Sequence, residues 1–313
     1  MAGSAGLKGV AGLLGSRIGG LRRVDACRGS YRVFLSGSVA PEGFEGEWDC
    51  CRLGCGGWGC AYRCRRPGST GGSVVFKVPR GLEGIVEEGE YPTVDERLLR
   101  KVTGLAGLVS RLRHPHILRL LGYSSMAPLL VYEYADMSSL DRQLGLGWSP
   151  SVRDVVLVGL QLGDALRYIH SRGLVHGDIK PGNVFAVNGV VKLGDFSGLV
   201  RLVTLTSRHP LAYTPGWRAP EQAFSDLRRR ASTAGLENRI DVYQLGNLLL
   251  YLLTGEAIDG EEAANPERVA EALSGVPHPG LRSLLEAMLA LEPEDRPNME
   301  EAVIRLYEIY KSL

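Results

Sequence analysis

The chain has 313 residues, and its 36 Lys and Arg residues against 35 Asp and Glu residues give a formal net charge of +1. This balance carries no bulk signature of nucleic-acid binding, and the hydrophobic content of 44% is ordinary for a globular chain. The apolar run at 248–253 is far shorter than the stretch of about 20 residues that crosses a membrane. We therefore expect a cytoplasmic protein with no transmembrane segment and no nucleic-acid partner.

Residues 1–46 are rich in Gly, Ala, Leu and Arg. Apolar residues recur there at helical spacing: Leu7, Val10, Leu14, Ile18 and Leu21. One interpretation of residues 1–24 is a basic amphipathic helix that contacts a membrane or a partner, and another is a transit peptide. However, glycines within this stretch each cost a helix about 1 kcal/mol relative to Ala: Gly9, Gly12, Gly15, Gly19 and Gly20. We favour a loosely ordered extension or a strip packed on the small lobe that follows.

All six cysteines lie in one short part of the chain: Cys27, Cys50, Cys51, Cys55, Cys60 and Cys64. No pair has the CxxC spacing that is usual in a structural zinc site. We favour an interpretation in which they are small apolar residues on the first two strands. A cross-strand disulfide, credible in an oxidising or hyperthermophilic cell, is the second interpretation, and a metal site is the third.

From residue 47 the pattern changes to short strands. We expect a hairpin of strands 48–53 and 60–66, a strand at 73–79, a helix at 94–112, and strands at 117–123 and 128–134. After residue 138 the pattern is mainly helical, with helices expected at 152–171, 239–253, 266–273, 281–291 and 299–313. Strands followed by helices predict an α+β fold in two lobes, a small antiparallel β-rich one and a larger, mainly helical one.

The expected hairpin turns at GCGGWG (54–59), where Gly54, Gly56 and Gly59 fit the pattern GxGxxG. A strand follows this turn where a dinucleotide-binding fold would have a helix. Glycines allow backbone N–H groups to approach phosphate oxygens closely. Lys77 lies on the next strand, at the end of the run VVFK (74–77) and eighteen residues after Gly59. A lysine in such a place is otherwise usually a surface residue.

The side chains with the most distinctive chemistry gather between residues 176 and 195. The sequence HGDIKPGN (176–183) places Asp178, Lys180 and Asn183 at fixed spacing, and Asp195 follows Asn183 by twelve residues. Carboxylate and amide oxygens are hard ligands that suit Mg²⁺ or Mn²⁺ better than zinc. Phosphoryl transfer needs positioning and charge neutralisation, and these residue types supply both.

In order and spacing, these motifs resemble those of the eukaryotic-type serine/threonine protein kinase superfamily over about residues 47–313. Further similarities lie in LRHPHI (112–117), TPGWRAPE (214–221), DVYQLG (241–246) and Arg296-Pro297. The resemblance implies an extension at 1–46, a kinase N-lobe and hinge at 47–135, and a C-lobe at 136–313. It also implies that ATP binds in the cleft between the lobes.

The resemblance implies a role for each reactive side chain of the second lobe. Asp178 would orient the substrate hydroxyl as the base, and Lys180 would neutralise the transferring phosphoryl group. Asn183 and Asp195 would hold the metal. Lysine at position 180 resembles the serine/threonine type, so the expected partner is a protein that bears Ser or Thr. Glu221 and Arg296 would form a buried structural pair, and Asp241 would anchor the catalytic loop.

For the first lobe, the resemblance implies nucleotide binding. The loop of Gly54, Gly56 and Gly59 would cover the phosphates, and Lys77 would grip the α- and β-phosphates. Backbone groups from Glu133 to Ala135 would meet the adenine edge.

The lysine of this family normally pairs with a helix glutamate, and that glutamate is ambiguous here. Counting back from LRHPHI leads to Leu105, which cannot pair, whereas counting forward from Lys77 leads to Glu96. We favour Glu96. Its competitors are Glu87, Glu88 and Glu90.

Two positions depart from the family pattern. Gly177 replaces the arginine that usually receives an activation-loop phosphate, so ordering by phosphorylation is not expected to work in the usual way. Ser197 replaces a glycine after Asp195-Phe196, which restricts backbone rotation there. Four hydroxyls between Asp195 and Glu221 are candidate autophosphorylation sites or simply solvated: Thr204, Thr206, Ser207 and Thr214.

The favoured function is therefore an active serine/threonine protein kinase that uses ATP with Mg²⁺ or Mn²⁺. A pseudokinase or nucleotide-binding scaffold with little catalysis is the alternative, because the helix glutamate is uncertain and Ser197 is unusual. A small-molecule kinase is a third candidate, disfavoured by the Ala219-Pro220-Glu221 motif that resembles a protein-substrate platform.

Overall fold

The computed structural model describes residues 2–25, 27–37, 39–91, 93–201 and 213–313. The chain divides into two compact units. The small unit comprises residues 23–113 and 117–136, and the large unit comprises residues 1–22, 114–116 and 137–313. The expected extension at 1–46 is thus shared between the units, and the expected boundary at 135/136 lies one residue from the division at 136/137.

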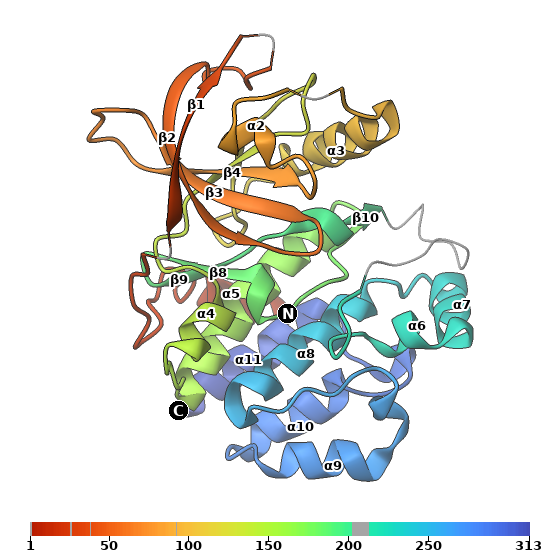
Figure 1. Cartoon of the computed structure of the whole chain (residues 1–313). Helices are drawn as coiled ribbons and strands as arrows, with labels where there is room; N and C mark the ends of the chain where they lie inside the picture. Colours follow the sequence, from red (N-terminus) through yellow and green to blue (C-terminus); the bar gives the residue numbers. More distant parts are fainter. Residues whose placement is uncertain (1, 26, 38, 92, 202–212) are drawn as a thin grey trace. The chain divides into compact units, whose positions relative to one another are not determined.

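The small unit is built on one antiparallel sheet with the strand order β1-β2-β3-β4-β6-β5 (Figure 1). In chain order its strands are β1 (Arg28–Leu35), β2 (Gly46–Cys55), β3 (Gly59–Arg65), β4 (Val74–Pro79), β5 (Leu120–Tyr123) and β6 (Leu130–Glu133). Its helices are α2 (Gly84–Glu87) and α3 (Glu96–Val109). A buried cluster formed mainly by β1–β4, with Ile85 and Val86 of α2, supports this sheet.

The large unit is mainly helical. Its helices are α1 (Ala2–Ala11), α4 (Leu140–Gly145), α5 (Val152–His170), α6 (Pro220–Ala223), α7 (Ser225–Ala234), α8 (Arg239–Thr254), α9 (Pro266–Ser274), α10 (Pro279–Met288) and α11 (Met299–Ser312). Its short strands are β7 (Leu174–Val175), β8 (Val184–Val187), β9 (Val190–Leu193) and β10 (Val200–Arg201). Short 3₁₀ turns are η1 (Pro181–Asn183), η2 (Phe196–Gly198), η4 (Glu262–Ala264) and η5 (Pro293–Asp295).

Two almost fully buried helices, α5 and α8, form the centre of the large unit. The α5 helix begins at a capping box, in which the Ser151 hydroxyl accepts from the Asp154 N–H and the Asp154 carboxylate accepts from the Ser151 N–H. Such caps satisfy the free N–H groups of the first turn. Gly159 lets α5 approach its neighbours closely, since an added Cβ would lie 3.0 Å from both Leu249 and Leu306.

The predicted α+β fold class is confirmed, with an antiparallel β-rich unit and a helical one. The structure adds to the sheet of the small unit one strand that the sequence analysis does not anticipate, and the short strands β7–β10 of the large unit are also not anticipated. In β1 the side chains of Val33 and Leu35 are buried while Arg32 and Phe34 are exposed. This alternation pairs β1 with β2 and extends the sheet.

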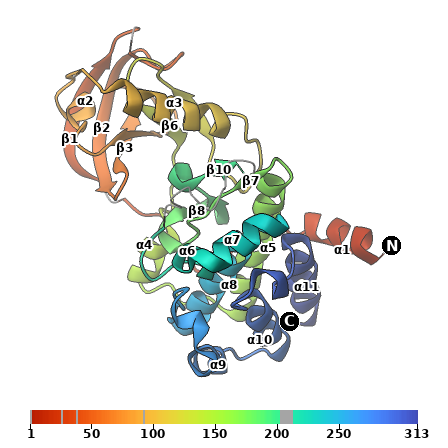
Figure 2. The same ribbon diagram turned by 90° about the vertical axis from the view of Figure 1, so that its right-hand side faces the viewer.

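The N-terminal segment up to Arg22 packs on the large unit, so the expected strip on the small lobe is wrong for these residues. Helix α1 lies beside α11 (Figure 2), and an added Cβ at Gly9 would lie 2.1 Å from the Tyr307 hydroxyl. The buried Gln161 amide donates to the carbonyls of Leu14 (3.1 Å) and Ser16 (2.8 Å). Such specific contacts do not describe a loosely ordered extension.

All six cysteines form disulfides: Cys27–Cys51, Cys50–Cys64 and Cys55–Cys60. The favoured interpretation as unpaired apolar residues is therefore wrong, and the cross-strand alternative is confirmed. The β2–β3 register places Cys50 opposite Cys64 and Cys55 opposite Cys60. The Cα atoms of these pairs are 4.1 and 4.0 Å apart. A one-residue shift in register would have moved these side chains to opposite faces.

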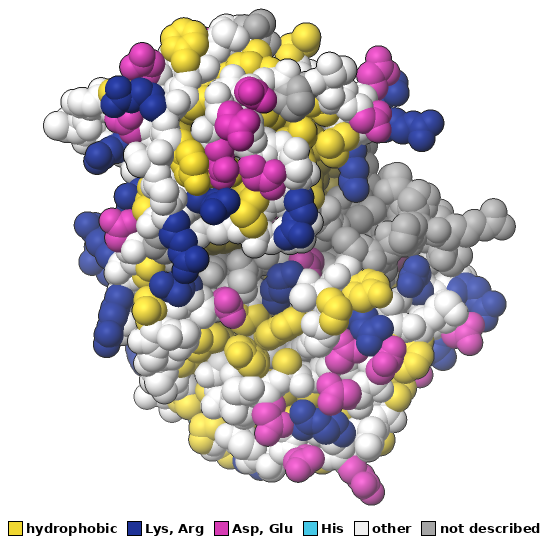
Figure 3. Space-filling view, viewed as in Figure 1, with side chains coloured by type: hydrophobic (Ala, Val, Ile, Leu, Met, Phe, Trp, Pro, Cys, Tyr) yellow, Lys and Arg dark blue, Asp and Glu magenta, His cyan; other side chains and the backbone are white. Residues whose placement is uncertain are grey.

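None of the helices that the structure describes has the length and apolar character of a membrane-spanning segment. On the face drawn in Figure 3, acidic and basic side chains are both spread over the surface, in keeping with the balanced composition.

Candidate active site

A buried carboxylate on α8, that of Asp241, anchors the loop of residues 176–183. Asp241 accepts from the N–H groups of His176 (3.0 Å) and Gly177 (2.8 Å), and it lies 2.7 Å from Nε2 of His170. Burial raises the pKa of Asp241, but the hydrogen bond and charge of His170 and the Gly177 N–H outweigh it and hold the pKa below its usual value. Asp241 thus remains an ionised acceptor, which supports its expected structural role.

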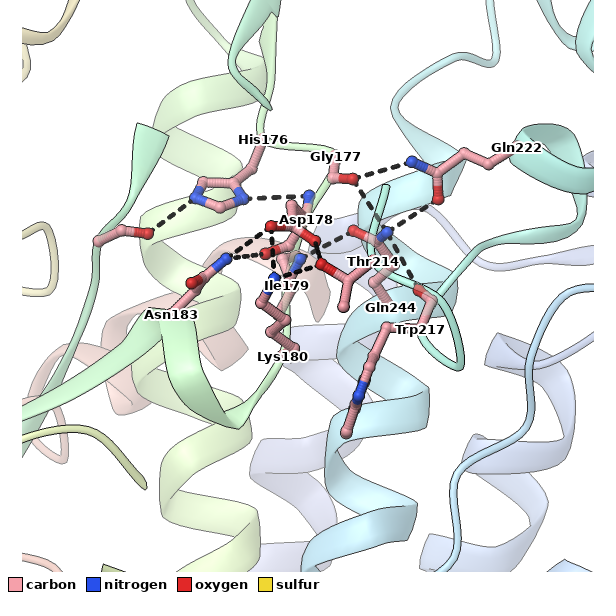
Figure 4. Close-up of polar contacts among 11 residues, drawn as sticks. His176, Gly177, Asp178, Ile179, Lys180, Asn183, Thr214, Trp217, Gln222 and Gln244 are labelled. Carbon is pink, nitrogen blue, oxygen red and sulfur yellow. Dashed lines mark hydrogen bonds and ion pairs between the residues drawn. The ribbon is translucent and has the colours of Figure 1, made fainter. Parts of the chain in front are cut away.

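Asp178 is the point on which the predicted side chains converge (Figure 4). Its Oδ2 accepts from Lys180 Nζ (2.9 Å) and from Asn183 Nδ2 (2.8 Å). Its Oδ1 accepts from the Thr214 hydroxyl (2.8 Å), which in turn accepts from Lys180 Nζ. The half-buried carboxylate therefore has a fixed orientation and a cation beside it.

From the sequence, Thr214 is a candidate autophosphorylation site or a solvated hydroxyl, and neither interpretation includes this contact with Asp178. The two residues are 36 positions apart, so no local pattern links them. The other three candidate hydroxyls, those of Thr204, Thr206 and Ser207, lie outside the described residues.

His176 joins the loop to the segment that carries Asp195. Its Nδ1 accepts from the Asp178 N–H (3.3 Å), so Nε2 carries the proton and donates to the Gly194 carbonyl (3.1 Å). The Gly194 N–H also donates to the carbonyl of Asn183 at 2.9 Å. These bonds bring the chain positions of Asn183 and Asp195 together within the large unit.

Asn183 and Asp195 have the donor set of a hard cation. The Asn183 amide nitrogen donates to both the backbone and the side chain of Asp178, each at 2.8 Å, which leaves the amide oxygen as the available ligand atom. Asp195 has a left-handed backbone with φ of 53°. One amide oxygen and one carboxylate suit Mg²⁺ or Mn²⁺.

In the small unit, the predicted glycine loop is the tight β2–β3 turn. The Gly56 N–H donates to the Gly59 carbonyl (2.9 Å), and the Arg80 N–H donates to the Trp58 carbonyl (3.1 Å). Gly59 is required by close packing, since an added Cβ would lie 1.9 Å from the Val78 carbonyl oxygen. A Cβ added at Gly54 or at Gly56 would meet no atom within 4 Å, so the turn is accessible at these two positions.

Lys77 lies on β4 opposite Ala61 of β3 and Leu130 of β6. Its ammonium nitrogen is 4.8 Å from the centroid of the Trp58 ring, a cation–π distance. The lysine and the glycine loop are thus neighbours within one sheet.

The structure does not bring the favoured helix glutamate to Lys77. Glu96 is the only acid of α3, its side chain is 83% exposed, and its carboxylate pairs with Arg100 at 3.2 Å. Glu87 is one of the competing glutamates, and its carboxylate accepts from the Tyr62 hydroxyl (2.7 Å) and from Arg52 (3.2 Å). The prediction missed this because counting along the chain cannot say which side of a helix faces a strand.

The two predicted adenine contacts, Glu133 and Ala135, lie at the end of β6 and just after it. The Glu133 N–H donates to the Arg119 carbonyl (3.0 Å), and its carboxylate accepts from the Arg119 N–H (2.7 Å). This pairing commits the Glu133 N–H and side chain to the neighbouring segment. Ala135 is buried.

Comparison with known proteins decides the family. The model of the protein kinase domain matches residues 50–307 of this chain.

The chain belongs to the protein kinase family.

Several curated relatives of this kinase domain are serine/threonine kinases by name. It is 31% identical over 265 residues to serine/threonine-protein kinase Pkn1 of Myxococcus xanthus, covering 78% of this chain and 35% of the relative. It is 30% identical over 263 residues to serine/threonine-protein kinase PknK of Mycobacterium tuberculosis, covering 78% and 22% respectively. It is also 27% identical over 262 residues to Aurora kinase of Dictyostelium discoideum, covering 80% and 62%. The kinase domain thus spans less than two thirds of each of these relatives.

The kinase domain contains the expected buried ion pair. Arg296 meets Glu221 through two bonds of 2.7 and 2.9 Å, and both side chains are fully buried. The remaining guanidinium hydrogens reach the carbonyls of Arg239, Ala290 and Leu291. Because each charge is matched by the other, removing one partner would leave the other as an uncompensated buried charge.

The two departures of this kinase domain from the family pattern have different consequences for its backbone. Gly177 has φ of 74°, in the left-handed region that favours glycine. Ser197, within the η2 turn, is not among the residues with positive φ. Serine at position 197 therefore costs no left-handed strain.

Proposed function

We propose that this kinase domain is a serine/threonine protein kinase that transfers the γ-phosphate of ATP to hydroxyls of a protein substrate. The observation that carries the proposal is the convergence of Lys180, Asn183 and Thr214 on the Asp178 carboxylate. A carboxylate that is so oriented can accept a hydrogen bond from an incoming hydroxyl and take its proton.

Each member of this group has a separate task in the proposed reaction. Asp178 orients the attacking hydroxyl of the substrate and accepts its proton. Lys180, held between Asp178 and Thr214, offers its positive charge to the phosphoryl oxygens as charge builds on them. Because the charge is already in place, little reorganisation accompanies the transfer.

Asn183 and Asp195 are the residues that would hold Mg²⁺ or Mn²⁺. When bound, the ion neutralises phosphate charge. In the small unit, the glycine loop at 54–59 and the ammonium group of Lys77 are the proposed contacts of the phosphate oxygens. Backbone groups between Glu133 and Ala135 remain the proposed adenine contacts. A cytoplasmic location is also part of the proposal, and it requires a cytoplasm that leaves three disulfides oxidised.

A nucleotide-binding scaffold is the second candidate, and one observation favours it. The only acid of α3, Glu96, pairs with Arg100 on the surface rather than with Lys77. The two candidates differ in whether bound nucleotide is turned over.

The test is transfer of labelled γ-phosphate from ATP, with Mg²⁺ or Mn²⁺, to the protein itself and to a generic basic protein. We expect label on serine or threonine with the wild type and none with Asp178→Ala or Asp195→Ala. Asp226→Asn is a matched control, because Asp226 is exposed on α7 and pairs only with Arg229 among the contacts described. ATP affinity, measured separately, should stay within about tenfold in Asp178→Ala, since the base does not hold the nucleotide.

Binding of ATP without any transfer by the wild type would favour the scaffold. Transfer of phosphate by Asp178→Ala at the wild-type rate would show that Asp178 is not the base.

A further inference from the structure

Two buried glutamines lie beside the catalytic loop and have no part in the proposed chemistry. Gln244 belongs to α8 and Gln222 to α6, and their exposed fractions are only 1% and 5%. A buried carboxamide must find hydrogen-bond partners, because an unmatched one is costly. Figure 4 shows both side chains directed at the backbone of the loop that carries Asp178.

Gln244 binds the chain on both sides of Asp178. Its Oε1 accepts from the Ile179 N–H (3.0 Å), and its Nε2 donates to the Gly177 carbonyl (3.0 Å). The donor and acceptor of one amide are thus matched to the acceptor and donor of the backbone. This pair of bonds fixes which atom of the carboxamide is nitrogen. It also restrains the peptide groups that set the direction of the Asp178 side chain.

Gln222 adds a second donor to the same carbonyl. Its Nε2 donates to the Gly177 carbonyl (2.9 Å), while its Oε1 accepts from the Ala219 N–H (2.8 Å) and from Gln244 Nε2 (2.9 Å). Gln244 Nε2 also lies 3.3 Å from the Trp217 carbonyl. The two amides therefore join the catalytic loop to the end of the activation segment at 217–219.

The contact point, Gly177, is also where this chain departs from the family pattern. It has no cationic side chain to meet a phosphate on the activation segment. Its backbone is instead held from both directions: Asp241 accepts from its N–H, and the two glutamines donate to its carbonyl. Neutral, permanently present groups thus connect the loop to the activation segment.

We propose that Gln244 and Gln222 are positioning residues that hold Asp178 in its reactive orientation without a charge on the activation segment. The inference rests on the proposed kinase function, in which Asp178 is the base. A displacement of about 1 Å in a reacting group can cost about a hundredfold in rate. Loss of the Gln244 bonds should therefore act on turnover more than on nucleotide binding.

The test compares two apolar replacements on the same helix. Gln244→Leu removes the bonds around Asp178. Asn247→Leu is the matched control, because the fully buried Asn247 makes the same two-bond contact with another loop, donating to the Ile258 carbonyl (3.1 Å) and accepting from its N–H (2.7 Å). We expect kcat of Gln244→Leu to fall about 10- to 100-fold while KM for ATP changes less than about threefold. In Asn247→Leu, kcat should stay within about threefold of the wild type.

A second variant and a second measurement cover the case in which Gln244→Leu does not fold. Gln222→Leu removes one of the two donors to the Gly177 carbonyl and should lower kcat by about tenfold. Amide hydrogen exchange, measured without nucleotide, should show faster exchange of the Ile179 N–H in Gln244→Leu and of the Ile258 N–H in Asn247→Leu.

The outcomes separate the two proposals. No phosphate transfer by the wild type would refute the kinase function, whereas exchange at Ile179 would still report on the positioning contact. Normal kcat in both glutamine variants would overturn the inference, and so would equal losses of kcat in Gln244→Leu and Asn247→Leu. Unchanged Ile179 exchange in Gln244→Leu would overturn it as well.

Discussion

Thr214 bridges the two residues that the proposed mechanism places at the phosphoryl group. Its hydroxyl donates to Asp178 at 2.8 Å and accepts from Lys180. We expect Thr214→Val, which keeps the shape but removes the hydroxyl, to lower kcat about 10- to 100-fold. Thr214→Ser should keep most of the activity, and the Kd for ATP should stay within about twofold in both variants. Steady-state kinetics with a serine-bearing protein substrate measures the difference.

The other hydroxyls of the activation segment serve as a comparison for Thr214. Thr204→Ala and Thr206→Ala are expected to lower activity only mildly, because Gly177 has no side chain to receive a phosphate. A large loss in either of them, or full activity in Thr214→Val, would contradict this division of roles.

Gly177 allows a further test at the scale of one residue. Because its φ is 74°, any side chain adds left-handed strain, so Gly177→Ala should lower the free energy of unfolding by about 1–2 kcal/mol. The nearest atom to the added Cβ would be the Gly198 carbonyl oxygen at 3.8 Å, so crowding is not the cause. Gly182→Ala in the same loop is the control, since its φ is not positive and nothing lies within 4 Å. Denaturant unfolding should show no comparable loss in Gly182→Ala.

Much of the candidate site could be predicted because several of its residues belong to one short sequence motif. Asp178, Lys180 and Asn183 lie within six residues, and their spacing alone places them together. The partners that complete the site come from distant segments: Thr214 lies 36 residues from Asp178, and Gln244 lies 65 residues from Ile179. A threonine or a glutamine carries no local signal of such a contact, so these roles needed the fold.

Helix α8 anchors the catalytic loop with a buried charge, and this gives the anchor a pH dependence. The pKa of Asp241 is held below its usual value despite burial, chiefly by His170. Its folded pKa therefore lies below the unfolded value of about 3.9. The stability that it contributes is present above about pH 4 and is lost as the pH falls through the folded pKa.

We therefore expect the difference in Tm between the wild type and Asp241→Asn to shrink as the pH falls below about 4. Thermal unfolding followed by circular dichroism measures both proteins. Asp226→Asn, which changes an exposed carboxylate, should track the wild type throughout. A difference that widens below about pH 4 would refute the assignment.

Two of the three disulfides lie within the β2–β3 hairpin. Cys50 and Cys64 are 14 positions apart, and Cys55 and Cys60 are 5 apart. In the loop-entropy description, removing the first bond costs about 3 kcal/mol and removing the second about 2 kcal/mol. Denaturant unfolding of the paired Cys→Ala variants should show this order. A thiol reductant should lower the Tm of the wild type more than that of the variants, and equal shifts would show that these bonds do not form.

At the scale of elements, periodicity predicted most helices and the strands of the hairpin, because each pattern repeats within one segment. Helix α7 escaped prediction since only Leu227 and Ala231 on it are buried and three arginines follow one another. Disulfide pairing escaped for another reason: it depends on the register between two strands, and the hairpin pattern does not determine register.

The segment of residues 2–22 connects parts of the large unit that are distant in the sequence. Gln161 binds the carbonyls of Leu14 and Ser16, the Trp148 indole donates to the Gly19 carbonyl (2.9 Å), and Gln143 binds both polar groups of the Arg22 backbone. Without the segment, the Gln161 and Trp148 donors would lose these partners, at about 1–3 kcal/mol each, whereas Gln143 would keep its bond to the Met137 carbonyl.

We expect deletion of residues 2–22 to lower the Tm by several degrees. Gln161→Leu should destabilise the full-length chain more than it destabilises the deleted one, because the donor that it removes already lacks partners there. Thermal unfolding of the four proteins gives the coupling, and additive effects would contradict the contact.

The placement of this segment also bears on the order in which the chain can fold. Residues 2–22 leave the ribosome before their partners, which extend from Gln143 to Tyr307. Contacts of such long sequence separation form slowly, because the intervening chain must be closed into a loop first. This segment is thus synthesised before its partners and finds its place only after they have been made. Until α11 has been synthesised, the surface of α1 that later meets it stays exposed, so the interval between the synthesis of the two helices is a stage at which a nascent chain needs protection from aggregation.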